Sequence, residues 1–152
     1  MIEAAVSALK SGELVIYPTD TIYGIGCDMM NKKALDKLNR LKNRPKNKSF
    51  SFICKDLSVA SRYAVLSDPA HRVMRRTLPG PYTFVLPKGE AIPRKMTSST
   101  HSVGIRIPDH PVTRTMADKF GSPIITTSVN VSTEEPVASV GDFAPEFLAA
   151  VA

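Results

Sequence analysis

The segment LNRLKNRPKNKSF, residues 38–50, carries a basic side chain at every second position: Arg40, Lys42, Arg44, Lys46 and Lys48. Pro45 interrupts the run, so the segment cannot be helical throughout. In an extended chain alternate side chains face one side, so we expect the cations from Arg44 onward to form a row, with Lys42 at the preceding helix end. Guanidinium and ammonium groups together suit a polyphosphate. A solvated loop and a contact with nucleic-acid backbone are the alternatives.

Two further segments carry polar residues at positions where ligands bind. IITTSVNVS, residues 124–132, is a predicted strand that ends in hydroxyl and amide side chains, including Ser128 and Asn130. Ligands of open α/β sheets lie at such strand ends, although serine and asparagine are also ordinary turn formers. Arg106 lies within the apolar segment VGIRIPDHP, residues 103–111. Because an unpaired buried guanidinium is costly, we expect an anion beside it, either a protein carboxylate or a ligand.

The segment YPTDTIYGIG, residues 17–26, is predicted to be a strand that runs into a polar turn. The turn contains Thr19, Asp20, Thr21 and Tyr23, followed by two glycines. This density of hydrogen-bonding groups beside a buried strand indicates the wall of a pocket for a polar ligand. The alternative is a strand end whose side chains cap a neighbouring helix.

Several common active-site patterns are absent from the sequence. Met29 occupies the position of the third glycine of a dinucleotide-binding GxGxxG motif, and neither GxxxxGK[ST] nor GxSxG occurs. The three histidines (His71, His101 and His110) have no metal-ligand spacing relative to the cysteines. An enzyme with this sequence would therefore act by positioning reactants and neutralising charge.

Composition and patterning predict the elements that must position these residues. The 152 residues are 43% hydrophobic, with a net charge of +6 that favours anionic partners. Short β-prone runs alternate with helical patterns, which predicts a single α/β domain, residues 1–152, with about five strands. We expect helix N-caps at Asn31, Asp68 and Asp109, and helix ends at Gly12 and Gly121.

The cysteines and the apolar runs indicate the compartment. Cys27 and Cys54 lie in apolar surroundings, which is typical of free buried thiols in a reducing cytosol. No secretory signal is visible, and no apolar run approaches the roughly 20 residues needed to span a membrane. We therefore expect a cytoplasmic protein without a membrane partner. The final AAVA is compatible with a native end and with a C-terminally shortened domain.

Together these segments resemble the threonylcarbamoyl-AMP synthase family, within the YrdC/YciO-like superfamily. Four family motifs match in order and spacing: YPTDTxYGLGCD as residues 17–28, PGPxTxVL as residues 79–86, VxxRxPxHP as residues 103–111, and the tetrad K-x-R…S-x-N as Lys42, Arg44, Ser128 and Asn130.

The resemblance implies a YrdC-like twisted, open mixed sheet with flanking helices and a concave basic face. It also implies the synthesis of L-threonylcarbamoyladenylate and pyrophosphate from L-threonine, bicarbonate or CO2, and ATP. A partner, the threonylcarbamoyl transferase machinery, would then modify adenosine 37 of certain tRNAs to t6A.

The resemblance also implies roles for individual residues. Lys42 and Arg44 would be catalytic and, with Lys48, would hold the triphosphate, whose oxygens would share the Mg²⁺. Ser128 and Asn130 would bind the nucleotide. The L-threonine would be contacted by the side chains of Thr21, Tyr23, Arg106 and Ser128.

Two departures from the family pattern lean toward the YciO-like branch. Ser49-Phe50 replaces Pro-Leu, and Ile53 stands where a threonine-binding histidine is expected. Thr133 also replaces a glycine that usually follows the S-x-N element. Two alternatives therefore stand beside the synthase. One is a protein that binds double-stranded RNA or tRNA with weak or no synthase activity, and the other is an enzyme that adenylylates a different carbamate because Ile53 alters the amino-acid pocket.

Overall fold

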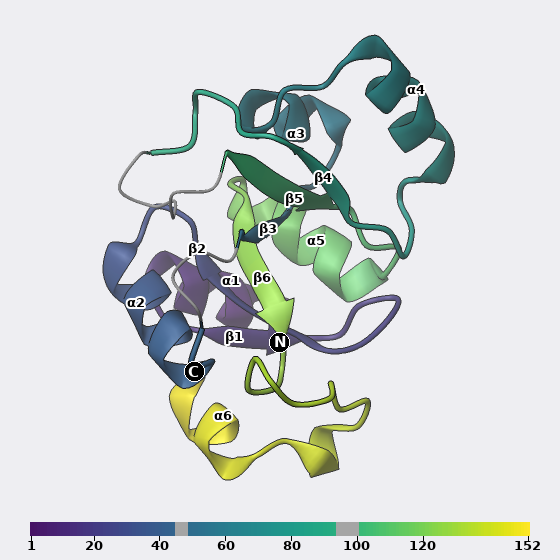
Figure 1. Cartoon of the computed structure of the whole chain (residues 1–152). Helices are drawn as coiled ribbons and strands as arrows, with labels where there is room; N and C mark the ends of the chain where they lie inside the picture. The colour runs from purple at the N-terminus through teal and green to yellow at the C-terminus, as the bar shows by residue number, and fades with distance from the viewer. Residues whose placement is uncertain (45–48, 94–100) are drawn as a thin grey trace.

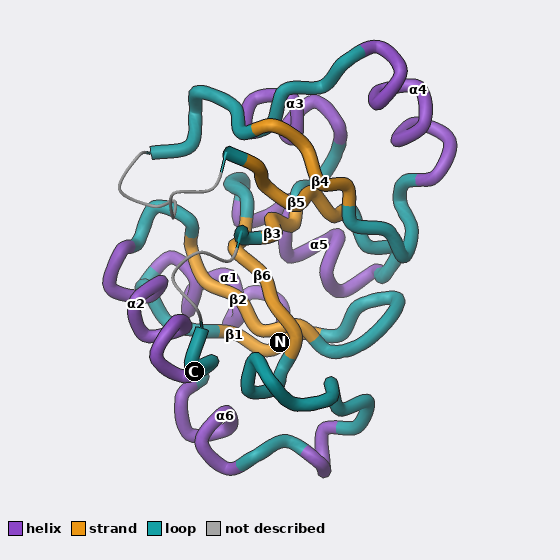
Figure 2. Tube along the Cα trace, viewed as in Figure 1, coloured by secondary structure: helices purple, strands orange, loops and turns teal. Residues whose placement is uncertain are grey.

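The computed structural model describes residues 1–44, 49–93 and 101–152. These residues form a six-stranded mixed sheet in the order β1-β2-β6-β3-β5-β4 (Figures 1 and 2). The strands are β1 Val15–Tyr17, β2 Gly24–Asp28, β3 Ser51–Ile53, β4 Phe84–Pro87, β5 Ser102–Arg106 and β6 Ile124–Ser128. Only β3 and β5 pair in parallel, and the other neighbours are antiparallel. The expected open, mixed α/β sheet is confirmed.

Helices cover both faces of this sheet. They are α1 Ile2–Lys10, α2 Lys32–Leu41, α3 Leu57–Tyr63, α4 Asp68–Thr77, α5 Pro111–Phe120 and α6 Pro145–Ala150. In Figure 1, α3 and α4 lie near the β4 end of the sheet and α2 and α6 near the β1 end. Their apolar side chains pack with one face of the sheet in the larger core cluster, and α1 and α5 pack on the other face. None of the helices described is long and apolar enough to cross a membrane.

The predicted helix boundaries are partly confirmed. The Asn31 side chain accepts a hydrogen bond from the Ala34 amide at 3.0 Å, as an N-cap does. Gly12 and Gly121 have left-handed φ angles of 80° and 78° where their helices end.

Two predicted caps are wrong. Ser67, not Asp68, caps α4, because its hydroxyl accepts from the Ala70 amide. Asp109 does not cap α5 either; its own backbone amide donates to the Asp20 carboxylate at 3.0 Å. That partner lies 89 residues away in the sequence, so the capping pattern gave no sign of it.

The sheet also contains one strand more than the five expected. Residues 24–28, of which we had placed the glycines in a turn, form β2 between β1 and β6. Gly26 has no room for a side chain, since a Cβ there would lie 2.4 Å from the Ile125 carbonyl oxygen and 2.7 Å from the Tyr17 hydroxyl. A Cβ on Gly24 would lie 2.8 Å from the Tyr17 ring. The glycines therefore let the Tyr17 ring cross β2 rather than forming a turn.

One face of the sheet has two unlike halves. Strand alternation places Tyr17, Ile53 and Ile124 on the same face as Ser51 and Ser128. We call the first group, together with Val15, the covered half, because it packs under α1 and α5. The open half comprises the small residues Gly24, Ser51, Gly104, Thr126 and Ser128, which the smaller core cluster does not include.

Candidate functional site

The open half forms the floor of a cavity of about 280 Å³. Ser51, Thr126 and Ser128 line it from β3 and β6, and Arg44 and Arg106 are the cationic side chains among the described residues that line it. Gly104 keeps this floor low, because a Cβ there would lie 2.5 Å from the Ser51 hydroxyl. Hydroxyl groups bordered by guanidinium groups are suited to bind an anionic, oxygen-rich ligand.

A buried hydrogen bond links the covered half to the open half. The Tyr17 hydroxyl donates to the Thr126 hydroxyl at 2.6 Å across β2. Tyr17 is 2% exposed, and burial raises the pKa of its phenol above the ordinary value. The group is therefore neutral and acts as a donor that orients Thr126 at the cavity edge.

Lys42 fixes the Ser-x-Asn turn to the end of α2. Its ammonium donates to the Ser128 carbonyl oxygen at 2.6 Å and to Asn130 Oδ1 at 2.9 Å, and the residue is 2% exposed. The backbone is tied as well, since the Ser132 amide donates to the Lys42 carbonyl at 3.1 Å. The Ser128 hydroxyl also donates to Asn130 Oδ1. Lys42, Ser128 and Asn130 of the sequence motif thus form one hydrogen-bonded group.

Arg44 lies two residues after Lys42 and borders the cavity. Its guanidinium donates to the Ser49 carbonyl and lies 4.8 Å from the centre of the Phe50 ring. Burial lowers its pKa from the ordinary value, and its Nε has no hydrogen-bond partner among the described residues. A half-buried cation with a free donor is a site that an anion would stabilise.

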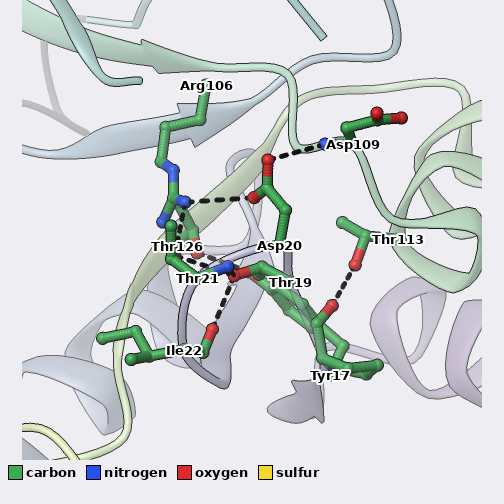
Figure 3. Close-up of polar contacts among 10 residues, drawn as sticks. Tyr17, Thr19, Asp20, Thr21, Ile22, Arg106, Asp109, Thr113 and Thr126 are labelled. Atoms are coloured by element: carbon green, nitrogen blue, oxygen red, sulfur yellow. Dashed lines mark hydrogen bonds and ion pairs between the residues drawn. The ribbon is translucent and has the colours of Figure 1, made fainter. Parts of the chain in front are cut away.

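Arg106 borders the cavity from the end of β5 and is held by the loop between β1 and β2 (Figure 3). It donates to the Thr21 hydroxyl at 3.0 Å and forms an ion pair with Asp20 at 3.7 Å. The expected anion beside Arg106 is therefore a protein carboxylate. Its Nε nevertheless lacks a hydrogen-bond partner in the described parts of the chain.

The loop that carries Asp20 is fixed by its own side chains, as Figure 3 shows. The Thr19 hydroxyl donates to the Ile22 carbonyl at 2.6 Å, and Thr113 on α5 donates to the Pro18 carbonyl. The interpretation of this segment as a pocket wall holds for Tyr23, whereas the alternative of a helix cap does not hold, because the Asp109 amide that Asp20 accepts from precedes the α5 N-cap His110. Thr19 and Asp20 satisfy backbone groups, while Tyr23 lines the cavity and contacts Phe143 edge-on at 5.4 Å.

The family model for Sua5, YciO and YrdC, which carries the description "Telomere recombination", matches residues 7–152. The chain belongs to the Sua5/YciO/YrdC family. The resemblance seen in the motifs is confirmed.

Individual members of the family support this assignment. A Photobacterium profundum protein named threonylcarbamoyl-AMP synthase is 37% identical over 91% of this chain and 77% of its own length. The Escherichia coli YciO crystal structure matches at a TM-score of 0.82 and 31% identity, over 88% of this chain and 66% of that one. P. abyssi Sua5 complexed with L-threonine matches at 0.91 and 28%, over 99% of this chain and 45% of that one.

The chain spans about two thirds of the length of the first curated relatives it matches. It covers 66% of a Haemophilus influenzae protein and 63% of Escherichia coli YciO.

Within this family fold, most of the predicted site residues come together. Arg44, Tyr23, Arg106 and Ser128 all line the cavity. Thr21 accepts a hydrogen bond from Arg106 at the cavity edge. Lys42 and Asn130 are hydrogen-bonded to Ser128, which lines the cavity. Lys48 and Lys46 lie outside the described residues. The alternating row of cations can therefore be followed only to Arg44.

The expectation for Ile53 is wrong. Its side chain is 1% exposed and packs in the covered half with Tyr17 and Met116. It is not among the described residues that line the cavity. Ile53 therefore gives no reason to expect an altered amino-acid pocket.

Sequence reasoning missed Ser51 and Thr83 in the cavity and the role of Asp20 as the partner of Arg106. The alternation in SFSFIC contained a signal for Ser51, because one face of that strand is polar. Thr83 and the Asp20 pair depend on contacts between distant segments, which the sequence does not display.

Proposed function

We propose that the protein is an L-threonylcarbamoyladenylate synthase, a nucleotidyltransferase. It would join L-threonine, bicarbonate or CO2, and ATP into threonylcarbamoyl-AMP, with release of pyrophosphate. The observation that carries the proposal is a single cavity with a hydroxyl floor and two guanidinium groups at its edge, Arg44 and Arg106. Relatives named threonylcarbamoyl-AMP synthase, and the Sua5 relative complexed with L-threonine, support the choice of substrates.

The chemistry suits a site that positions reactants. A carboxylate oxygen of N-carboxythreonine attacks the α-phosphorus of ATP, a new P–O bond forms, and the bond to pyrophosphate breaks. No protein nucleophile is needed, so the side chains must orient the reactants and stabilise the leaving charge. Arg44 would bind the phosphates, Ser128 and Thr126 would bind oxygens at the floor, and Lys42 would hold the Ser128 backbone in place.

The residues present fit ATP and its metal ion. The partnerless Nε atoms of Arg44 and Arg106 are donors that phosphate or carboxylate oxygens could accept from. The described residues contain no group of three or more acidic, histidine or cysteine side chains able to hold a metal. Mg²⁺ bound to the ATP phosphates would supply charge neutralisation for the leaving pyrophosphate, and Arg44 would bind phosphate oxygens beside it.

The test measures pyrophosphate release and labelled adenylate from ATP, labelled bicarbonate and L-threonine. We expect release only when all three are present, and loss in Arg44→Ala on the order of 2–4 kcal/mol in the transition state, or roughly 30- to 1000-fold. Arg40→Ala is the matched control, since Arg40 is exposed on α2 in the same basic run. Wild-type turnover in Arg44→Ala, or release with another amino acid but not threonine, would contradict the proposal.

A second candidate function, binding of double-stranded RNA or tRNA, is favoured by α4. Arg72, Arg75 and Arg76 line a hollow of about 300 Å³ on its exposed surface. None of the ion pairs among the described residues involves these arginines. Such unpaired arginines suit the phosphate backbone of a nucleic acid.

This function is tested by fluorescence anisotropy with a tRNA and a duplex RNA at several salt concentrations. Replacing the three arginines by glutamine should weaken binding and flatten its salt dependence. The control removes the same charge elsewhere, with glutamine at the exposed Lys10, Lys33 and Arg40. Equal loss in both variants would show that net charge alone attracts RNA.

A further inference from the structure

The two guanidinium groups of the cavity differ in how their charge is balanced. Arg106 has a carboxylate partner, Asp20, and the two side chains are 16% and 13% exposed. Arg44 donates to a backbone carbonyl and lies over an aromatic ring, and none of the ion pairs found in the described chain includes it. One edge of the cavity is therefore close to neutral and the other carries a net positive charge.

Asp20 is held beside Arg106 by a second contact, although its oxygen nearest Arg106 lies 3.7 Å away and has no hydrogen-bond partner among the described residues. Its second oxygen accepts from the Asp109 amide at 3.0 Å, which anchors the carboxylate to the segment between β5 and α5 (Figure 3). The preceding residues are fixed as well, because Thr113 donates to the Pro18 carbonyl. These contacts hold the Asp20 carboxylate beside Arg106.

A fixed negative charge discriminates between ligands by their own charge. A polyphosphate brings several negative charges and would be repelled by Asp20 at short range, and this repulsion is stronger in a partly buried site than in water. A single carboxylate is repelled less and can accept from the remaining guanidinium donors of Arg106. The same repulsion is absent at Arg44.

We infer that Asp20 is a positioning residue that sorts the two anions of the reaction, reserving the Arg106 side of the cavity for the amino-acid carboxylate and leaving the Arg44 side to the polyphosphate. This inference rests on the proposed function for the identity of the amino acid. It requires no adenylate formation, because it concerns only where each anion binds.

The experiment measures the binding of inorganic tripolyphosphate and of L-threonine to the full chain by calorimetry, separately and together. In the wild type, tripolyphosphate should leave threonine affinity nearly unchanged. Asp20→Asn keeps an acceptor for the Asp109 amide but removes the charge. It should bind tripolyphosphate about tenfold more tightly, as expected for removal of a close like charge, and tripolyphosphate should now compete with threonine.

Asp28→Asn is the matched control, since Asp28 also accepts from a backbone amide, that of Met30 at 2.8 Å, and forms no ion pair with an arginine in the described structure. It should bind both probes as the wild type does. Asp20→Asn with wild-type affinities and no competition would overturn the inference, as would the same tightening in Asp28→Asn.

A second pair of variants keeps the test decisive if Asp20→Asn does not fold. Arg44→Gln should lose tripolyphosphate binding at least tenfold, while Arg106→Gln should retain it within about twofold. Equal losses in the two variants would overturn the sorting of anions. A protein that binds tripolyphosphate in this pattern but binds no L-threonine would instead contradict the proposed function and leave the charge partition intact.

Discussion

The covered and open halves of one sheet face share strands, but the covered half packs in the core and the open half lines a cavity. Along β6, Ile124 is fully buried under α5, Thr126 is 4% exposed at the border, and Ser128 lines the cavity. Side chains of the covered half are large and apolar, whereas those of the open half are glycine, serine and threonine. The difference teaches that a binding surface here arises where helix cover stops and side chains become small.

The largest effect is expected from a substitution in the covered half alone, which tests whether stability and ligand affinity depend on different halves. Leu9 on α1 has no exposed surface and packs there, far from the cavity lining. Leu9→Ala should lower the free energy of unfolding by about 2–5 kcal/mol, because a cavity remains in the core. Urea unfolding measures this loss, and tripolyphosphate affinity per folded molecule should stay unchanged. Lost binding at wild-type stability would show that the halves are not separable.

Lys42→Met tests the connection between the end of α2 and the Ser-x-Asn turn, which continues from the open half. The change leaves the Ser128 carbonyl and Asn130 Oδ1 without their buried cationic donor. We expect a loss of about 1–3 kcal/mol in stability together with reduced nucleotide affinity. Lys37→Met on the same helix is the control, since its ion pair with Glu13 is 40% and 47% exposed and should contribute under about 1 kcal/mol. Similar effects of both changes would refute the special role of Lys42.

A smaller effect is expected at the border. Tyr17→Phe removes the hydrogen bond to Thr126 and should cost about 0.5–1.5 kcal/mol. Burial raises the pKa of Tyr17, so its contribution is complete below the unfolded value of about 10 and is lost as pH rises above it. The wild type should therefore lose more stability than Tyr17→Phe between pH 9 and about 11, as thermal unfolding would show. Parallel pH curves would contradict this.

The smallest effect concerns the thiols on the far face of the sheet. Burial raises the pKa of Cys27 and of Cys54 to about 12, so neither is a thiolate at neutral pH. Both are free and buried, as the sequence predicted. A thiol reagent should modify the native protein far more slowly than the urea-unfolded protein, without change in ligand binding. Rapid native modification would show that this face opens readily.

Local patterns were enough to predict much of the fold. The helix over residues 32–41 followed from its cap at Asn31 and from the spacing of Ala34, Leu35 and Leu38. Gly12 and Gly121 marked helix ends because their conformation is local. The strand β2 was missed because its glycines were interpreted as turn residues, and the Tyr17 ring that requires them comes from another strand.

The sequence predicted several residues that lie at the candidate site, but not the contacts that these residues make. Of the motif residues, Arg44, Ser128 and Arg106 lie around one cavity and Lys42 contacts Ser128, while their roles in binding stay predictions. Their partners were not predicted, since Lys42 reaches Ser128 across 86 residues and Asp109 reaches Asp20 across 89. Sequence spacing carries no information on which of several cations is neutralised by the protein itself.

The strand order has a consequence for how the cavity is assembled during folding. The strand β6 is the last of the six in the chain, yet it lies between β2 and β3 in the middle of the sheet. Until it inserts, the earlier strands form two separate ribbons with unsatisfied edges, and long-range pairing of this kind folds slowly. The cavity floor, which includes Thr126 and Ser128, is therefore completed only when β6 pairs with β2 and β3.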